Sequence, residues 1–441
     1  MHPFTALLTT AIFIPFSLHA ASLKTHRIVP EKELLITDVA VVDSPLATYP
    51  GPLSFGHLMK KMAGKNEPSE FLKRWLLSWE KKHVVNTHPL PPRKSIRKLL
   101  IDPWKAKDGF ALAPDDEWDV NCKNAPFRLL AIINRTDLAE LPDPPTQLER
   151  RIPAYYKTQN SENFSGEGRF VFAALDSEGN PLPGDFTIIL EYSLLGNVSR
   201  WAQEWHTLGK FEEFDGSYLN QIATITNRFT GSIRQIRTSE ASFDPVREFR
   251  EFALNKDGFL APKTLVATPA SRFEHLRVRT VDNDALGKYI NEHADAIKAG
   301  EATYPTSLKL STGESPRFLA ARALIPPNGG STFIWKARST RDPEARRTFS
   351  MNTCNGCHAA ETETDSCLHI HPRISGEPAK LSKFLQIGSV YRVPNPGPGG
   401  AVIRLAEMER RVEFFKTLLN PDLPFSEIQS LRKRFAARNA H

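Results

Sequence analysis

Cysteine is scarce in this sequence, with 4 residues in 441. So few cysteines cannot form the dense set of bridges that holds small secreted domains together, so the chain must build its own hydrophobic cores. Hydrophobic residues at 40% and charged residues at 24% are typical of globular domains and exclude a disordered or membrane-embedded class. After the first twenty residues, no stretch is long and apolar enough to cross a bilayer, which takes about 20 residues.

Several signatures of common functions are also missing. The chain has no dense run of Lys and Arg interleaved with aromatic residues, so we interpret its net charge of +7 as a solubility feature and predict no nucleic-acid partner. It lacks Gly-x-Ser-x-Gly, His-Glu-x-x-His, a phosphate-binding P-loop and Gly-x-Gly-x-x-Gly. These absences remove the commonest hydrolase, zinc protease and nucleotide-binding functions.

The N-terminus has the pattern of a secretory signal peptide. An apolar stretch covers residues 6–18 and is followed by His19-Ala20-Ala21, which offers small residues before a cleavage point. We therefore predict a signal peptide over residues 1–21 and a periplasmic or extracellular location. The mature protein is expected to have no transmembrane segment.

Hydrophobic periodicity predicts both helices and strands. Residues 34–42, 127–133, 169–175 and 186–192 read as strands, and residues 176–185 have the composition of a hairpin loop. Helices are expected at residues 56–63, from residue 68 onward, and at 201–211, 217–229, 284–300, 378–388, 405–419 and around 428–435.

These elements predict an α+β fold built on an antiparallel sheet. We expect a helical N-terminal region at residues 22–110, a mixed α/β domain at 111–325 and a small, mostly helical domain at 326–441. The Pro- and Gly-rich stretch at residues 325–330 is the predicted hinge before the last domain.

One motif carries specific chemistry, the sequence Cys354-Asn355-Gly356-Cys357-His358. Two thiols three positions apart lie on the same side of one helical turn, where they can form thioethers with the two vinyl groups of a haem. The next residue, His358, can then bind the iron as proximal ligand. The motif therefore predicts one covalently attached haem c.

Two other uses of these cysteines remain open. Cys354 and Cys357 could bind zinc together with two of four nearby residues, because the spacing also suits a tetrahedral site. Those four residues are His358, Cys367, His369 and His371. Alternatively, Cys354 and Cys357 could form a reducible disulfide.

Residues 349–358 and the late amphipathic helix resemble the haem-attachment segment of c-type cytochromes. Small c-type cytochromes usually supply a Met ligand from a downstream loop, whereas Met408 falls on the apolar face of an expected helix. A wider set of segments resembles a group of exported bacterial proteins with no assigned activity, which implies the periplasm or the cell exterior. These segments are residues 54–59, 125–130, 166–170 and 352–358.

Two further expectations concern the residues around the motif. His369 or His371 is the predicted distal iron ligand, because each follows His358 after a short loop and both project to one side of an extended chain. Cys122 and Cys367 remain once haem has used the other two cysteines, and we predict a disulfide between them in an oxidising compartment.

The function favoured by these observations is one-electron transfer through the haem, with an unidentified redox protein as partner. Two alternatives stay open. The chain could be an extracellular binding or structural protein with a Cys/His zinc site. It could also be a haem enzyme such as a peroxidase, which needs an open distal position and a nearby acid-base residue.

Overall fold

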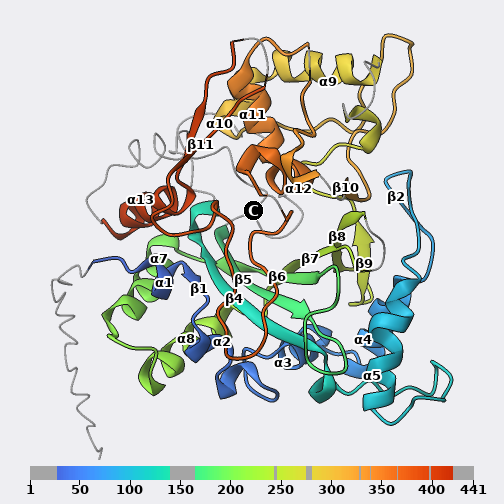
Figure 1. Cartoon of the computed structure of the whole chain (residues 1–441), viewed down its shortest axis with the longest axis vertical. Coiled ribbons are helices and arrows are strands. Elements are labelled where there is room, and N and C mark those ends of the chain that lie inside the picture. The colour runs from blue at the N-terminus through green and yellow to red at the C-terminus, as the bar shows by residue number, and fades with distance from the viewer. Residues whose placement is uncertain are drawn as a thin grey trace, which may run out of the picture.

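The computed structural model describes residues 27–139, 164–242, 246–274, 281–326, 329–337, 339–364, 366–396 and 399–420. The predicted signal peptide and the helix expected around residues 428–435 lie outside these ranges. Figure 1 shows a central sheet with one group of helices on each side. The fold is mixed α+β, as the sequence predicts.

The central sheet is antiparallel and has eight strands. Seven of them follow the order β1-β4-β5-β6-β7-β8-β10, and β9 also pairs with β8. Their bounds are β1 Leu35–Ile36, β4 Phe127–Arg135, β5 Phe164–Ala174, β6 Phe186–Leu195, β7 Ile233–Glu240, β8 Arg247–Leu254, β9 Leu260–Lys263 and β10 Ala323–Ile325.

One face of the sheet is apolar and carries the main core. Alternate residues of a strand point to opposite faces, so Phe170, Phe172, Ile188 and Leu190 all point to this side. Phe172 contacts Phe55 edge-on, with ring centroids 5.4 Å apart. The helices that cover this face are α3 Phe55–Ala63, α4 Pro68–Ser78, α7 Val198–His206 and α8 Gly216–Phe229.

A glycine sets how closely helix α8 approaches the sheet. Gly168 lies on β5 beneath the ring of Phe229, and a Cβ atom at residue 168 would come within 2.4 Å of that ring. Phe229 also contacts Phe170, with ring centroids 6.0 Å apart. The missing side chain therefore lets α8 pack directly on the strand.

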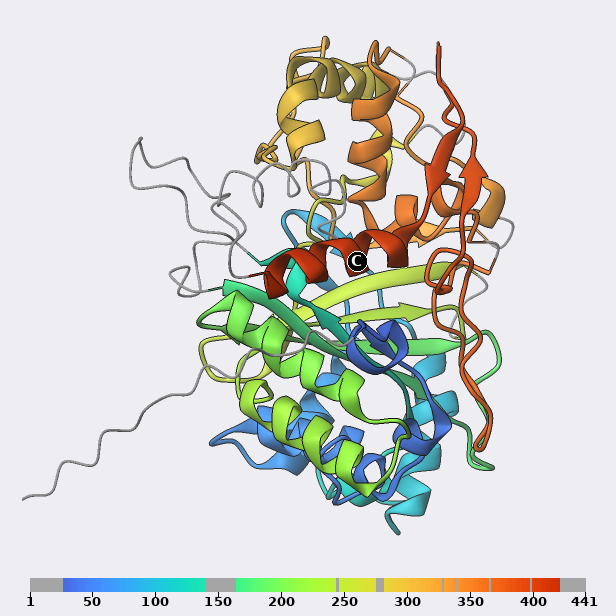
Figure 2. The same cartoon turned by 90° about the vertical axis from the view of Figure 1, so that its left-hand side faces the viewer.

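The opposite face of the sheet is covered by the later part of the chain (Figure 2). Three helices, α9 Val281–Glu292, α10 Ala294–Ala299 and α11 Pro343–Met351, form a second hydrophobic cluster with the neighbouring loops. The short helix α12 Cys354–Cys357 follows α11, and the hairpin of β11 Tyr391–Val393 and β12 Ile403–Leu405 leads into α13 Glu407–Leu419.

The remaining elements lie at the edges of these layers. They are α1 Pro30–Glu33, α2 Val39–Val42, α5 Asp102–Lys107 and the hairpin of β2 His83–Val85 with β3 His88–Leu90.

Three segments differ from the sequence-based expectation. Residues 378–388 form no helix, because they run as an irregular strap in which Leu381 bridges to Ile370. The helix expected at 284–300 begins at Val281 and is divided at His293 into α9 and α10. Residues 34–42 contain the two-residue strand β1, and α2 then takes their second half.

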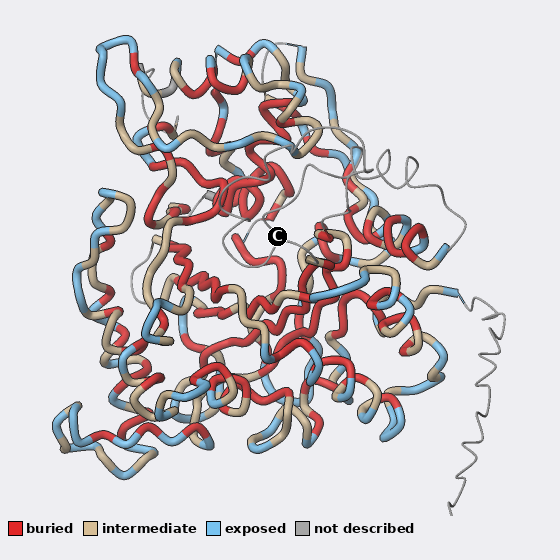
Figure 3. The backbone as a smooth tube through the Cα atoms, turned by 180° about the vertical axis from the view of Figure 1, so that it is seen from behind, coloured by how far each residue is buried: buried red, intermediate tan, exposed pale blue. Residues whose placement is uncertain are grey.

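Buried residues run through the sheet and into α11 and α12, as Figure 3 shows. The largest hydrophobic cluster includes residues from Leu34 to Leu418, so all three regions predicted from the sequence contribute to one core. Among the described residues, no helix has the length and hydropathy needed to span a membrane.

Candidate functional site

The haem-type motif lies on α12, a helix of one turn held at both ends. Thr353 caps its N-terminus, because the Thr353 Oγ1 accepts a hydrogen bond from the Gly356 backbone N–H at 3.0 Å. Gly356 packs tightly on the preceding helix, and a Cβ atom there would come within 2.2 Å of the Ser350 carbonyl oxygen. The second variable position of the motif is therefore closed to any larger residue.

A buried ionic clamp fixes the chain that follows the motif. Glu361 is fully buried and accepts hydrogen bonds from two successive arginines of α11, Arg346 Nη1 at 2.5 Å and Arg347 Nη1 at 3.0 Å. The motif residue Asn355 is fixed separately, because its Oδ1 accepts from Trp335 Nε1 at 2.9 Å and its Nδ2 donates to Glu274 at 2.9 Å. Nothing in the local sequence identifies these partners.

A backbone carbonyl and an aromatic side chain set the orientation of the His358 ring. Its Nδ1 lies 3.0 Å from the Cys367 carbonyl oxygen, and its ring packs on Phe249 with centroids 4.9 Å apart. Burial, supported by Arg247 and Arg237, lowers the pKa of His358 to about 4. The imidazole is therefore neutral at physiological pH, which is the form that binds a metal. A hydrogen bond from Nδ1–H to the carbonyl assigns Nε2 as the ligating nitrogen.

Of the two predicted distal ligands, the structure brings only His369 to the motif. The ring centroids of His369 and His358 are 4.4 Å apart, and the His369 Nε2 lies 3.6 Å from the Cys357 Sγ. His371 is more exposed and contacts the Ser366 hydroxyl through its Nε2 at 3.0 Å. The sequence could not separate these two histidines, because an extended chain would place both on one side.

The contact between the two rings has a consequence for ligation. Two imidazoles on opposite sides of one metal ion hold their ligating nitrogens about 4 Å apart, since each metal–nitrogen bond is about 2 Å, and their ring centres lie further apart still. The 4.4 Å between the centroids of His358 and His369 is too short for that arrangement. Ligation by both residues therefore requires the ring of His369 to move away from that of His358.

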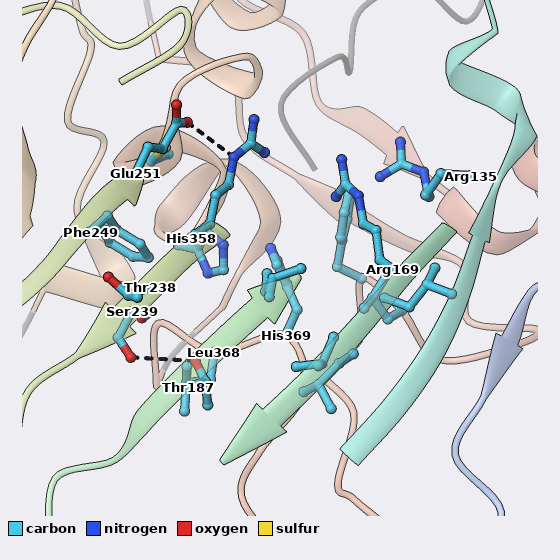
Figure 4. A pocket seen from close by; sticks show the side chains of 18 of the residues that line it. Arg135, Arg169, Thr187, Thr238, Ser239, Phe249, Glu251, His358, Leu368 and His369 are labelled. Carbon is cyan, nitrogen blue, oxygen red and sulfur yellow. Dashed lines mark hydrogen bonds and ion pairs between the residues drawn. The ribbon is translucent and has the colours of Figure 1, made fainter. Parts of the chain in front are cut away.

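A cavity of about 800 Å³, its opening included, lies between α12 and the sheet. Cys354, from the C-terminal part of the chain, lines it. His358 and His369 line it as well and are labelled in Figure 4. A large part of the remaining wall is apolar. It comes from three strands, from Leu368 and from the strap, and its residues are Ile133, Val171, Ile189, Leu368, Phe384 and Leu385. This part of the cavity suits an apolar group.

Another part of the wall is charged and includes Arg169, Arg237 and Glu251 from neighbouring strands of the sheet. The strand register sets Arg169 opposite Glu191, and Arg237 opposite Glu251. Arg169 Nη2 lies 3.3 Å from Glu191, while Arg237 Nε donates to Glu251 at 3.0 Å. Burial raises the pKa of Glu251 to about 7, against the opposing effect of Arg237. The sheet face above the core is thus ionic although it is buried.

The structure does not join Cys122 to Cys367, and both remain thiols. Cys122 lies beside α3, where its carbonyl carbon and oxygen press against Gly56 on the apolar side of the sheet. Cys367 belongs to the cluster of α9–α11 on the other side. The sheet therefore separates the two thiols, and the predicted bridge is absent because sequence gives no information on this distance.

The described residues contain no group of three or more His, Cys, Asp or Glu side chains that could hold a metal ion. The zinc ligand set considered from the sequence is therefore not assembled in this conformation. For a haem, Cys354 and His358 line a cavity whose wall is partly apolar and partly cationic, whereas Cys357 does not line it. Haem has the same division, with an apolar ring and two carboxylates.

No family model, curated protein or solved structure matches this chain. The interpretation of the site depends on its geometry and chemistry alone.

Proposed function

We propose that this chain is an exported mono-haem c-type cytochrome-like protein that transfers single electrons through a haem attached at Cys354 and Cys357. One observation carries the proposal: the Cys-x-x-Cys-His helix forms a wall of the cavity, with its histidine neutral and fixed through Nδ1. Neither a surface thiol pair nor a structural disulfide needs a cavity beside it.

Three residues of the motif would hold the haem. Cys354 and Cys357 would provide the two thioethers, and His358 Nε2 would bind the iron. When bound, the haem supplies a one-electron iron couple. The Cys367 carbonyl keeps the His358 ring in one orientation, and the burial of Cys354, Cys357 and His358 limits their contact with water.

The proposed location is the periplasm or the cell exterior. It rests on the signal-like residues 1–21 and on the resemblance to exported bacterial proteins. A redox protein of unknown identity is the proposed partner, since a mono-haem carrier must exchange its electron with another centre.

Production in a host with cytochrome c maturation machinery tests the proposal. The purified protein is expected to be red, and its colour should survive denaturation, because thioethers hold the haem covalently. The double variant Cys354→Ala/Cys357→Ala is the matched control and should lose the attached haem. A colourless parent protein with one zinc ion per chain would contradict the proposal and favour the zinc alternative.

The identity of the distal ligand needs separate variants. We propose His369 for this position, because it lines the same cavity as His358 and would bind the iron once its ring turns away from His358, whereas His371 does not line the cavity. His369→Ala should change the visible spectrum of the haem protein, and His371→Ala should leave it unchanged. Identical spectra in both variants would remove His369 from the coordination sphere.

A haem enzyme such as a peroxidase is the second candidate, and Glu251 favours it. This buried carboxyl group lines the same cavity as His358, and a pKa of about 7 suits a residue that accepts and returns protons. Hydrogen peroxide and a small reducing dye provide the assay. Turnover that falls at least tenfold in Glu251→Gln, with the haem still attached, would favour the enzyme over the carrier.

A further inference from the structure

Three arginines gather at the polar side of the cavity, one from each of three elements. Arg135 ends β4, Arg169 lies on β5 and Arg411 lies on α13, and all three line the cavity. Their exposed fractions are 1%, 4% and 3%, so each guanidinium is almost completely removed from bulk water. Figure 4 shows Arg135 and Arg169 side by side on neighbouring strands.

Carboxylates behind the cavity engage only part of these guanidinium groups. Arg411 donates its Nε to Glu407 at 3.0 Å, and neither of its terminal nitrogens has a partner among the described residues. Arg135 donates its Nε at 2.8 Å and one terminal nitrogen at 3.1 Å to Asp137. Its other terminal nitrogen has no partner within the described part of the chain.

Arg169 repeats this pattern on the next strand. Its Nε and one terminal nitrogen contact Glu167 at 2.7 Å and 2.6 Å, and the same terminal nitrogen lies 3.3 Å from Glu191. In the described residues, its second terminal nitrogen has no protein acceptor. Burial is the largest influence on Arg135 and Arg169 and lowers the pKa of each despite the adjacent carboxylates.

Two carboxylates near α13 each contact two arginines. Asp137 contacts Arg135 and Arg410, and Glu407 contacts Arg410 and Arg411. A buried cation without full compensation is costly, and proteins normally supply an anion to such a site. The unpaired nitrogens at the cavity wall show where that anion would bind.

We propose that Arg135, Arg169 and Arg411 form a binding site for a carboxylate carried on an apolar ligand. The planar guanidinium fork matches a carboxylate in shape and charge. The adjoining apolar wall of Ile133, Val171 and Ile189 accommodates the body of the ligand. The carboxylate could come from the propionates of the proposed haem or from a separate small molecule, and the first source rests on the proposed function.

Arg411→Gln is the sharpest variant, because Glu407 keeps its ion pair with Arg410 when Arg411 is replaced. Arg404→Gln removes the same charge from an exposed pair with Glu409 and is the matched control. Arg411→Lys retains the positive charge, so it distinguishes the loss of that charge from a general folding defect. Thermal melting of each variant shows whether it is folded before binding is measured.

The first arm uses the full chain made without haem-attachment machinery, with decanoate as probe and 1-decanol as its uncharged counterpart. Calorimetry should show decanoate binding in the parent and in Arg404→Gln. Arg411→Gln should weaken it about tenfold to a hundredfold, the usual effect of losing a hydrogen bond to a charged group. Decanol should bind more weakly and without dependence on Arg411.

The second arm uses the chain with haem attached and separates the two sources. If propionates occupy the site, decanoate no longer binds, and Arg411→Gln lowers the midpoint potential because a cation near the iron is lost. If decanoate still binds with the same dependence on Arg411, the natural ligand is a separate carboxylate.

The site is refuted if neither arm depends on Arg411, that is, if decanoate binding and the potential both match those of Arg404→Gln. A chain that never attaches haem would defeat the proposed function but not this site, because the first arm alone then decides it.

Discussion

Replacing Glu361 by Gln should destabilise the protein far more than the loss of one surface charge would. Glu361 is fully buried and forms ion pairs with both Arg346 and Arg347. The glutamine side chain would keep the shape and one acceptor, but it would remove the negative charge that both guanidinium groups share. Breaking a buried pair in this way costs about 3 to 5 kcal/mol.

The loss of stability on replacing Glu361 lies at the lower end of that range. Arg346 donates to two further acceptors, the Trp335 carbonyl at 2.9 Å and the Asn395 Oδ1 at 2.8 Å. Its guanidinium group therefore keeps these two hydrogen bonds when Glu361 is replaced. We therefore expect a loss of about 3 kcal/mol. With an unfolding entropy of about 2.1 cal/mol/K per residue, this loss lowers the Tm by about 3 °C in a chain of this size.

Scanning calorimetry of the purified protein measures the change. Glu363→Gln is the matched control two residues away, because its contact with Lys383 at 3.3 Å is solvent-exposed and is expected to contribute about 0 to 1 kcal/mol. Equal melting temperatures for the two variants would refute the reasoning, since they would show that the buried clamp is worth no more than a surface pair.

Three further predictions test other parts of the structure. Burial opposes ionisation of Asp137, but its arginine neighbours outweigh burial and lower its pKa, so its stabilisation is present above about pH 4 and is lost as the pH falls below it. Melting curves between pH 7 and pH 3 should therefore show a smaller acid loss in Asp137→Asn than in the parent. Gly356→Ala places a Cβ atom 2.2 Å from the Ser350 carbonyl oxygen, and it should cost about 1 to 3 kcal/mol and reduce the yield of attached haem, read from absorbance per chain. Thiol counting on the denatured, unreduced haem protein should find two reactive groups, Cys122 and Cys367, and a count of zero would show that a bridge forms after all.

The sequence predicts the elements whose periodicity reflects burial on one side. Helices α3 and α4 and strand β4 begin within one residue of their expected positions, because Ser54, Pro68 and Phe127 mark these starts. The helix expected at 378–388 is wrong for an instructive reason. Its apolar residues Phe384 and Leu385 line the cavity from an irregular strap, so their spacing reflects the cavity wall and not a helical face.

Only one part of the candidate site could be predicted from the sequence. The motif residues from Cys354 to His358 are contiguous, so their spacing alone indicates haem chemistry. Arg135, Arg169 and Arg411 come from distant elements and become neighbours only in the fold. On its strand, Arg169 shares a face with Glu167 and Val171, and nothing in this local sequence shows that the face is buried beneath the C-terminal part.

The ion pair between Asp43 and Arg373 has a consequence for folding during synthesis. Arg373 donates to both carboxylate oxygens of Asp43 at 2.9 Å and 2.6 Å across 330 positions of sequence, and also to the Leu129 carbonyl at 2.9 Å. At about 5 to 20 residues per second, a ribosome needs roughly 15 to 65 seconds to synthesise that interval. The ionic face of the sheet is complete only once β8 has been made, and part of its cover, Phe384, Leu385 and Arg411, follows Arg373. A nascent chain that stops short of Arg373 therefore leaves part of this face exposed to water.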